Sequence, residues 1–175
     1  MGSRNEQIIR YSKAMITIHW VVAVLVVAAW FTAEGGKSVV GNPPVLHFSL
    51  GLAVLALMVP RLVLRFVNQA PPAQSEQRPW LNFAAKTGHI VLYAFLIGLP
   101  LSGWYAASRL GAPVSFFGIG LPAIAAPVQG APGLIAEIHE NAGTVILYLA
   151  GLHALMAGWH HLVLRDGTLR RMSPL

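Results

Sequence analysis

The stretch ITIHWVVAVLVVAAWF, from Ile16 to Phe31, contains one residue that does not suit its surroundings. The other residues are apolar or tolerate hydrocarbon, as in a membrane-spanning helix. His19 stands among them, and a polar ring that leaves water without a partner costs several kcal/mol. The stretch therefore predicts a membrane helix in which His19 has a specific partner.

The composition of the whole chain is that of a membrane protein. Of its 175 residues, 55% are hydrophobic and only 10% are charged. Soluble domains usually carry about 25% charged residues. Because the length suits one domain, we expect a single domain over residues 1–175.

The charge and the absence of cysteine exclude several classes of function. The net charge is +6, but the basic residues flank the apolar runs instead of forming a stripe with interleaved aromatic residues, so we expect no nucleic-acid partner. The chain has no cysteine, which excludes disulfides, thiolate metal sites, cysteine-ligated iron–sulfur clusters and thioether-linked haem. Any metal must be held by imidazole, carboxylate or thioether groups.

Four apolar runs are long enough to cross a bilayer, which takes about 20 residues. They cover about residues 14–33, 45–64, 83–107 and 138–164. Residues 110–136 also lack charge, but their prolines and glycines are too frequent for a continuous helix. We expect an ordered loop over 108–137, with room for a short helix lying on the membrane surface.

The basic residues predict how the four spans are oriented. Ten of them fall on the side that holds both termini and the second-to-third connection, and only Lys37 and Arg109 fall on the other side. Since cytoplasmic loops carry the excess of Lys and Arg, both termini should be cytoplasmic and the 108–137 loop periplasmic. The expected fold is an all-α, up-down-up-down, four-helix membrane bundle. The ten residues are Arg4, Arg10, Lys13, Arg61, Arg65, Arg78, Lys86, Arg165, Arg170 and Arg171.

The seven histidines all lie in the four apolar runs or at their ends, and four of them pair by depth. His139 and His153 are fourteen residues apart, so they lie within about 40° of one helical face and about 21 Å apart along the axis. His19 matches the depth of His153, and His47 matches that of His139. The full set is His19, His47, His89, His139, His153, His160 and His161.

Two pairs of imidazoles at different depths suit two non-covalent b-type haems, each with two axial nitrogens. Gly51 and Gly143, each one turn after a histidine, leave room for a flat porphyrin. Zinc fits less well, because two nitrogens leave a tetrahedral ion half-liganded. One membrane histidine alone is more often a satisfied hydrogen-bonding residue, whereas four that pair by depth favour ligation of iron.

Other polar residues have more than one interpretation. Arg61 lies fourteen residues after His47, near the depth of the cytoplasmic pair, and an intramembrane arginine needs an anion such as a haem propionate. Arg65 is a second candidate for a propionate, although simple anchoring by positive charge explains it at least as well. His89 either competes with His19 or supports the ligands. His160 lies beside a haem edge or a docked quinone, or it is a snorkelling interfacial residue.

Several motifs resemble the bacterial cytochrome b561 family. They are RYSKAMITIHW, LHFSLGLAVLALMVPRLVLR, TGHIVLYAFLIGLPLSGW and IHENAGTVILYLAGLHALMAGWHHLVLRDGTLRRM, and together they cover nearly the whole chain. The resemblance implies a multi-pass protein of the bacterial inner membrane with two haem b groups, bound by His19 with His153 and by His47 with His139. It also implies electron exchange with ubiquinone or another quinone, near residues that match Arg78 and His160.

One well-known family member is a superoxide:quinone oxidoreductase, but this chain departs from what that activity requires. A protein that oxidises superoxide should present a basic periplasmic surface to attract the anion. The periplasmic loops here carry only Lys37 and Arg109, against Glu34 and Glu137. This weakens the superoxide assignment and leaves the haem assignment intact.

The leading hypothesis is transfer of electrons across the membrane, between a periplasmic donor such as superoxide and the quinone pool, which would make the chain an oxidoreductase. One alternative is a haem-b membrane anchor that relays electrons for a partner dehydrogenase or hydrogenase. A second alternative is a non-redox membrane protein whose histidines relay protons or bind a metal. Fold class alone does not separate them.

Overall fold

Four long helices dominate the computed structural model, which describes residues 10–33, 39–68, 79–128 and 133–174. They are α1 (Lys13–Phe31), α2 (Val45–Val67), α3 (Pro79–Leu110) and α4 (Gly133–Trp159). All four are long and apolar enough to cross a membrane, α4 together with the π-helical turn η1 (His160–Leu164) that continues it. A short helix, α5 (Thr168–Met172), follows.

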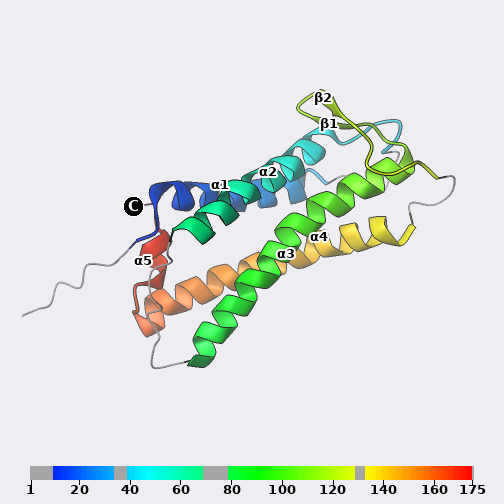
Figure 1. Ribbon diagram of the computed structural model, residues 1–175. Coiled ribbons are helices and arrows are strands. Elements are labelled where there is room, and N and C mark those ends of the chain that lie inside the picture. Colours follow the sequence, from blue (N-terminus) through cyan, green and yellow to red (C-terminus); the bar gives the residue numbers. More distant parts are fainter. Residues whose placement is uncertain (1–9, 34–38, 69–78, 129–132, 175) are drawn as a thin grey trace, which may run out of the picture.

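Consecutive helices run alternately toward opposite ends of the bundle (Figure 1). α1 begins, α2 ends, α3 begins and α4 ends at one end, which we call the terminus end. The opposite end, which we call the loop end, holds the start of α2 and a small hairpin. α2 packs on α1 and α3, and α3 packs on α4, whereas direct contacts between α1 and α4 are sparse.

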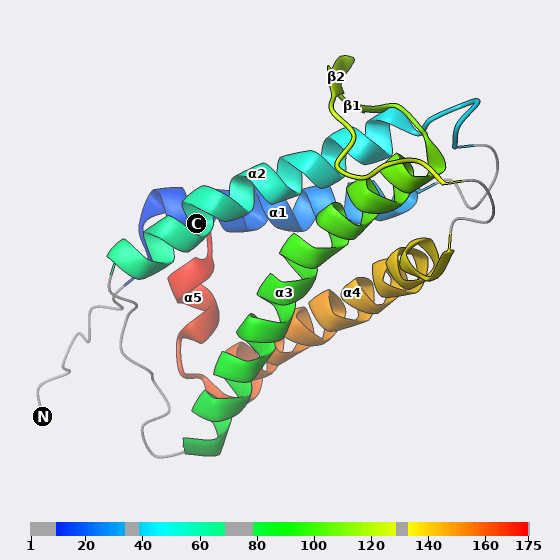
Figure 2. The same ribbon diagram turned by 45° about the vertical axis from the view of Figure 1, so that its right-hand side comes forward.

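The two helix pairs diverge toward the terminus end, and α5 lies between them there (Figure 2). Backbone carbonyls of the C-terminal segment tie it to α1. The Arg171 carbonyl accepts from the Tyr11 amide at 3.3 Å, and the Met172 carbonyl accepts from Trp20 Nε1 at 2.9 Å. The guanidinium of Arg10 donates to the Ser173 carbonyl. The C-terminal segment thus joins the end of α4 to the start of α1.

The interior of the described bundle is small, and most large apolar side chains face outward, as expected where lipid replaces water as the solvent. Several half-buried helical glycines border open space. A Cβ atom added at Gly51 or Gly143 would have no atom within 4 Å, apart from its own helix and its chain neighbours. There is therefore open space beside Gly51, one turn after His47, and beside Gly143, one turn after His139.

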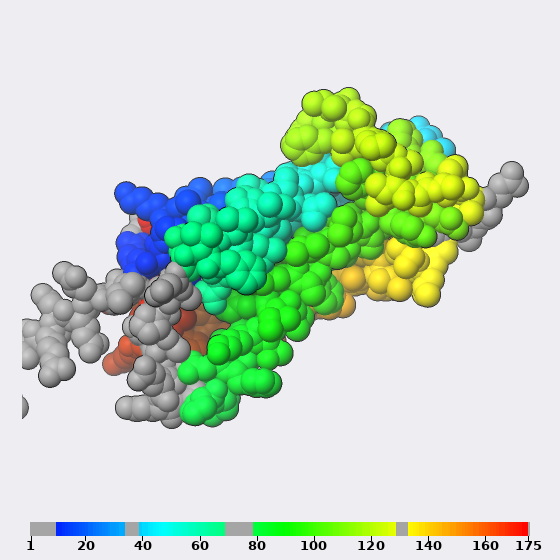
Figure 3. Space-filling view, in the orientation of Figure 1, coloured from blue at the N-terminus to red at the C-terminus, as the bar shows by residue number. Residues whose placement is uncertain are grey.

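After α3 the chain forms a two-stranded antiparallel hairpin of β1 (Val114–Phe116) and β2 (Ile119–Leu121), and no helix is found in residues 111–128. Loops with this many prolines and glycines favour turns over helix. The hairpin forms a raised feature beside the start of α2 (Figure 3). Val114 of β1 is buried together with Ala107 and Ala112, and this cluster packs against Phe48 and Leu52 of α2.

Two serine hydroxyls fasten this loop to the helices. Ser49 is fully buried; its hydroxyl donates to the Val45 carbonyl at 2.7 Å and accepts from the Phe117 amide at 2.8 Å. The Ser108 hydroxyl donates to the Trp104 carbonyl at 2.8 Å and accepts from the Ile124 amide at 3.1 Å. Each serine satisfies a loop amide that no strand partner reaches.

Replacing Ser49 by alanine should destabilise the folded protein, because the Phe117 amide loses its acceptor. The expected cost is about 1–3 kcal/mol of unfolding free energy, measured as a lower melting temperature in detergent. Thr32→Ala is the matched control, since the hydrogen bonds that the Thr32 hydroxyl makes among the described residues go to the Ala28 and Ala29 carbonyls of its own helix, at 2.9 and 3.1 Å. Equal losses in the two variants would contradict the role given to Ser49.

Candidate haem sites

At the loop end, the rings of His47 on α2 and His139 on α4 face one another. Their centroids are 6.0 Å apart and the ring planes are inclined by 85°. Two imidazoles that share one metal ion have centroids separated by about 6 Å, because each metal–nitrogen bond is about 2 Å long and each ring adds its own radius. The structure brings these two rings together, and their binding of iron stays a prediction.

Hydrogen bonds fix which ring nitrogen of each histidine is free. His47 Nδ1 lies 2.8 Å from the Ala29 carbonyl, and His139 Nδ1 lies 3.0 Å from the Leu99 carbonyl. Because a carbonyl can only accept, each Nδ1 carries the proton and each neutral ring keeps the Nε2 lone pair for a metal. These carbonyls could not be predicted from the sequence, since backbone acceptors leave no trace in residue identity.

Residues of the neighbouring helix α3 bond to the His139 ring and pack tightly against it. The Ser102 hydroxyl lies 3.1 Å from His139 Nδ1 and itself donates to the Leu99 carbonyl at 2.8 Å. A Cβ atom on Gly103 would come within 2.7 Å of His139 Cε1, so only glycine leaves room for the ring there. The His139 ring is thus held against α3 by hydrogen bonds at Nδ1 and by close packing on Gly103.

At the terminus end, three imidazoles gather instead of two. The His153 ring centroid lies 6.1 Å from that of His19 and 5.4 Å from that of His89. His89 Nδ1 donates to the Ala85 carbonyl of its own helix at 2.7 Å, which leaves its Nε2 free. The positions of the rings alone therefore do not decide whether His19 or His89 is the partner of His153.

Arg61 of α2 distinguishes His19 from the other rings. It is only 5% exposed, and its Nη2 donates to His19 Nδ1 at 2.9 Å. In this arrangement the neutral His19 ring carries its proton on Nε2, the nitrogen that a metal would need. Within the described residues, Nε and Nη1 of Arg61 are buried without a hydrogen-bond partner. A buried guanidinium with two unused donor atoms is suited to a carboxylate.

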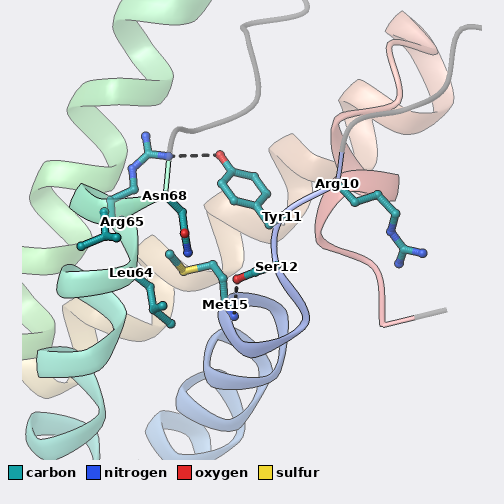
Figure 4. A pocket seen from close by; sticks show the side chains of 8 residues that line it. Arg10, Tyr11, Ser12, Met15, Leu64, Arg65 and Asn68 are labelled. Carbon is teal, nitrogen blue, oxygen red and sulfur yellow. Dashed lines mark hydrogen bonds between the residues drawn. The ribbon is translucent and has the colours of Figure 1, made fainter.

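Arg65 lies one turn further along α2 and takes a different partner. Its Nη1 donates to the Tyr11 hydroxyl at 3.2 Å, beside a pocket of about 440 Å³ at the terminus end (Figure 4). The two arginines predicted to bind propionates therefore have separate surroundings, and Arg61 is the one at the histidine cluster. The pocket is lined by Arg10, Tyr11, Ser12, Met15, Leu64, Arg65, Val67 and Asn68.

Of the two residues predicted to lie near quinone, the structure describes only His160. Arg78 lies outside the described residues. His160 opens the π-helical turn, and its Nδ1 lies 2.5 Å from Asp166 Oδ2. Asp166 Oδ1 also accepts from the Thr168 amide at 3.0 Å, and the chain reverses through left-handed Arg165 and Gly167. The carboxylate of Asp166 thus orients the His160 ring. Asp166 was not predicted as a site residue, although the pair Asp166–Gly167 is a common turn signal.

Metal sites of other kinds are not evident. Among the residues that the structure describes, no three His, Cys, Asp or Glu side chains are arranged to hold a metal ion. The imidazole pairs leave the remaining coordination positions of any metal to a planar ligand or to solvent. This donor set suits haem iron better than zinc.

Asp166 should make folding stability depend on pH. Burial favours the protonated carboxyl, but the hydrogen bonds from His160 and Thr168 outweigh it and hold the pKa below its ordinary 3.8. The ionised carboxylate therefore stabilises the folded state at pH above 3.8, and this contribution is lost as the pH falls through the lowered folded-state pKa. Melting temperatures of wild type and Asp166→Asn, measured from pH 6 downward, should differ at the higher pH and converge in acid. A gap that stays constant would contradict this.

Comparison with known proteins agrees with these features. The family described as prokaryotic cytochrome b561 matches residues 10–174. Probable superoxide oxidase CybB of Yersinia pestis is 32% identical over 169 residues, which cover 94% of this chain and 96% of that protein. Cytochrome b561 homolog 1 of Escherichia coli (strain K12) is 30% identical over 171 residues, covering 94% and 97%. Cytochrome b562 of Cereibacter sphaeroides is 30% identical over 172 residues, covering 93% and 94%. The chain therefore belongs to the prokaryotic cytochrome b561 family of multi-pass bacterial membrane proteins, which bind haem b and transport electrons.

Proposed function

We propose that this chain is a di-haem membrane cytochrome that transfers electrons between a periplasmic donor and the quinone pool of the bacterial inner membrane. One observation carries the proposal: two imidazole pairs lie at opposite ends of one bundle, with centroid separations of 6.0 and 6.1 Å. A protein that used histidine only for helix–helix hydrogen bonds would have no need of two such pairs.

The residues present fit haem b in three respects. The rings of His47 and His139 lie close together, and hydrogen bonds at Nδ1 leave the Nε2 lone pair of each ring available. Gly51 and Gly143 border open space next to these rings. At the other end, Arg61 has unused donors for a propionate carboxylate. We assign His47 with His139 to one haem and His19 with His153 to the other, with His89 as a supporting residue and Arg65 as a weaker propionate candidate.

The fit at His19 implies that Arg61 changes partner. While Arg61 donates to His19 Nδ1, the His19 proton sits on Nε2. If Arg61 donates to a carboxylate instead, Nδ1 of His19 can take the proton and Nε2 becomes a free ligand. Carboxylate binding by Arg61 and ligation by His19 should therefore support one another.

When bound, haem b supplies an iron centre that exchanges one electron reversibly. The chain's residues orient and tune that centre. Bonds from Nδ1 to the Ala29 and Leu99 carbonyls make the opposite ring nitrogens of His47 and His139 better donors. At the terminus end, the positive charge of Arg61 favours the more negative, reduced state. The terminus-end centre should therefore have the higher potential, which favours electron flow from the loop end toward the terminus end.

We place the terminus end in the cytoplasm and the loop end in the periplasm, from the excess of basic residues beside the termini. Quinone then binds at the cytoplasmic end, where His160 and Arg78 are assigned to it by family resemblance. Because His160 Nδ1 faces Asp166, its Nε2 is the nitrogen that can exchange a proton with quinone oxygen. Lipid and quinone are the expected partners within the membrane.

Superoxide is the first donor to consider, because the Yersinia pestis relative is named a probable superoxide oxidase. One observation favours a second candidate, a cytochrome that relays electrons for a protein partner. The loop side of the chain has two basic residues in its connections, so electrostatic attraction of superoxide is weak. A docked donor protein would not depend on that attraction.

Alanine variants of the fourth-helix histidines should each lose a different haem. His139→Ala removes the ligand shared with His47, and His153→Ala removes the one shared with His19. Redox-titrated absorption spectra of the purified variants should each keep one b-type component, with about half the wild-type haem content. His89→Ala is the matched control and should keep both. Loss of the same component in both ligand variants, or loss of one in the control, would contradict the pairing.

Purified protein without a partner should separate the two donors. Incubated with a superoxide-generating system and a soluble ubiquinone analogue, a superoxide oxidase forms quinol at a rate well above the protein-free rate. His139→Ala should reduce this rate at least tenfold, since it removes the loop-side centre. A wild-type rate equal to the protein-free rate, with both haems present, would instead favour the relay for a partner protein.

A further inference from the structure

We propose that the β1–β2 hairpin is a membrane anchor, whose tip inserts Phe117 and Ile119 into the boundary between headgroups and hydrocarbon in the loop-end leaflet. This surface is independent of the haem sites. Its occupant is the lipid bilayer, as the depth, the composition and the backbone conformation of the hairpin indicate.

The depth of the tip follows from its bond to α2. The Phe117 amide donates to the hydroxyl of Ser49, which is four residues inside the helix that begins at Val45, or about 6 Å along its axis. With 23 residues, α2 is about 34 Å long, against about 30 Å of hydrocarbon. If α2 is centred in the bilayer, Ser49 lies just inside the hydrocarbon boundary, and the hairpin tip lies at the same level.

A second bond supports this depth from another helix. Trp104 of α3 donates from Nε1 to the Pro122 carbonyl, directly after β2, at 3.1 Å. Tryptophan is enriched at the level of the headgroups, where its ring meets hydrocarbon and its N–H meets polar groups. The turn before β2 and the residue after it are therefore each bonded to a helix, at Ser49 and Trp104.

The exposed surface of the loop is apolar and uncharged. Phe117 and Ile119 are 62% and 68% exposed, and Ile124 and Val128 further along are also exposed. From Leu110 to Ala136 the chain has no Asp, Glu, Lys or Arg. A loop that projected into water would expose these side chains at a cost, whereas apolar groups at the interface gain from contact with lipid.

The backbone of the tip gives independent support. Phe117 has φ of 48° and is followed by Gly118 with φ of 89°. Hairpin turns of this kind favour Asn, Asp or Gly, and a bulky residue with positive φ is rare because it is strained. Phenylalanine at position 117 destabilises the turn, so we infer that contacts of its side chain with lipid offset this strain.

Backbone at membrane depth needs partners for its polar groups, and several of those in the hairpin have partners within the protein. The strands pair Val114 with Leu121, Ser115 with Gly120 and Phe116 with Ile119. The Phe117 amide at the tip is satisfied by the Ser49 hydroxyl. The buried Ser49 thus allows the turn to enter the interface.

The chain has no cysteine, so single cysteine variants can be labelled at one chosen position. Ile119→Cys, carrying an environment-sensitive fluorophore, is compared with Asn42→Cys, an exposed position before α2 at the same end. Both are measured as haem-loaded protein in nanodiscs of phosphatidylethanolamine and phosphatidylglycerol. Lipids that bear a doxyl group near the headgroup should quench the label at residue 119 at least threefold more than at residue 42. Aqueous iodide should show the reverse order.

Equal iodide quenching at the two positions would overturn the proposal, because the tip would then lie in water. Protection of residue 119 from both quenchers would also overturn it, because a protein surface such as a second copy would then cover the tip. In the labelled Ile119→Cys protein, Phe117→Asn should lower doxyl quenching by half or more, since asparagine suits the turn but not lipid. Phe117→Leu should keep most of it, and no change in the asparagine variant would remove Phe117 from the anchor.

Discussion

A polar ring at membrane depth must have each of its nitrogens satisfied, and this constraint organises the bundle. At the loop end it is met by backbone: the Ala29 and Leu99 carbonyls accept from Nδ1 of His47 and His139. These acceptors belong to α1 and α3, while the rings belong to α2 and α4. Placing one pair of rings therefore requires all four helices, since every helix contributes either a ring or its acceptor.

The terminus end meets the same constraint differently. A charged side chain, Arg61, occupies Nδ1 of His19, and a third imidazole, His89, lies beside His153. A backbone carbonyl can only accept a hydrogen bond from the ring, whereas the Arg61 side chain can give up its bond to His19 and bind an anion instead. The loop-end pair is thus held by groups that cannot move independently, and the terminus-end pair by one that can. In the proposed function, this difference allows the two centres to have different potentials within one small bundle.

Hydropathy alone predicted the four helices, because the cost of exposed backbone in lipid leaves a long apolar segment with few other structures. Depth along the helices predicted that His47 lies near His139 and His19 near His153, and the ring centroids are 6.0 and 6.1 Å apart. It did not predict that the His89 ring lies nearer to His153, at 5.4 Å. Residues that depend on tertiary contact were not predictable. Asp166 becomes significant only through the π-helical turn that carries His160 toward it, and Ser49 only through the hairpin that folds back on α2. For the 110–128 segment, proline and glycine excluded a long helix but did not reveal strand pairing.

Both ring pairs draw one member from α4, which carries His139 and His153, and α4 follows the other three long helices in the chain. Neither site can be complete while the first three helices alone are inserted. In the proposed function, a chain with only α1, α2 and α3 inserted would therefore hold one proposed ligand of each pair and lack the other. Loading of the two proposed centres through these pairs would begin only when α4 enters the membrane.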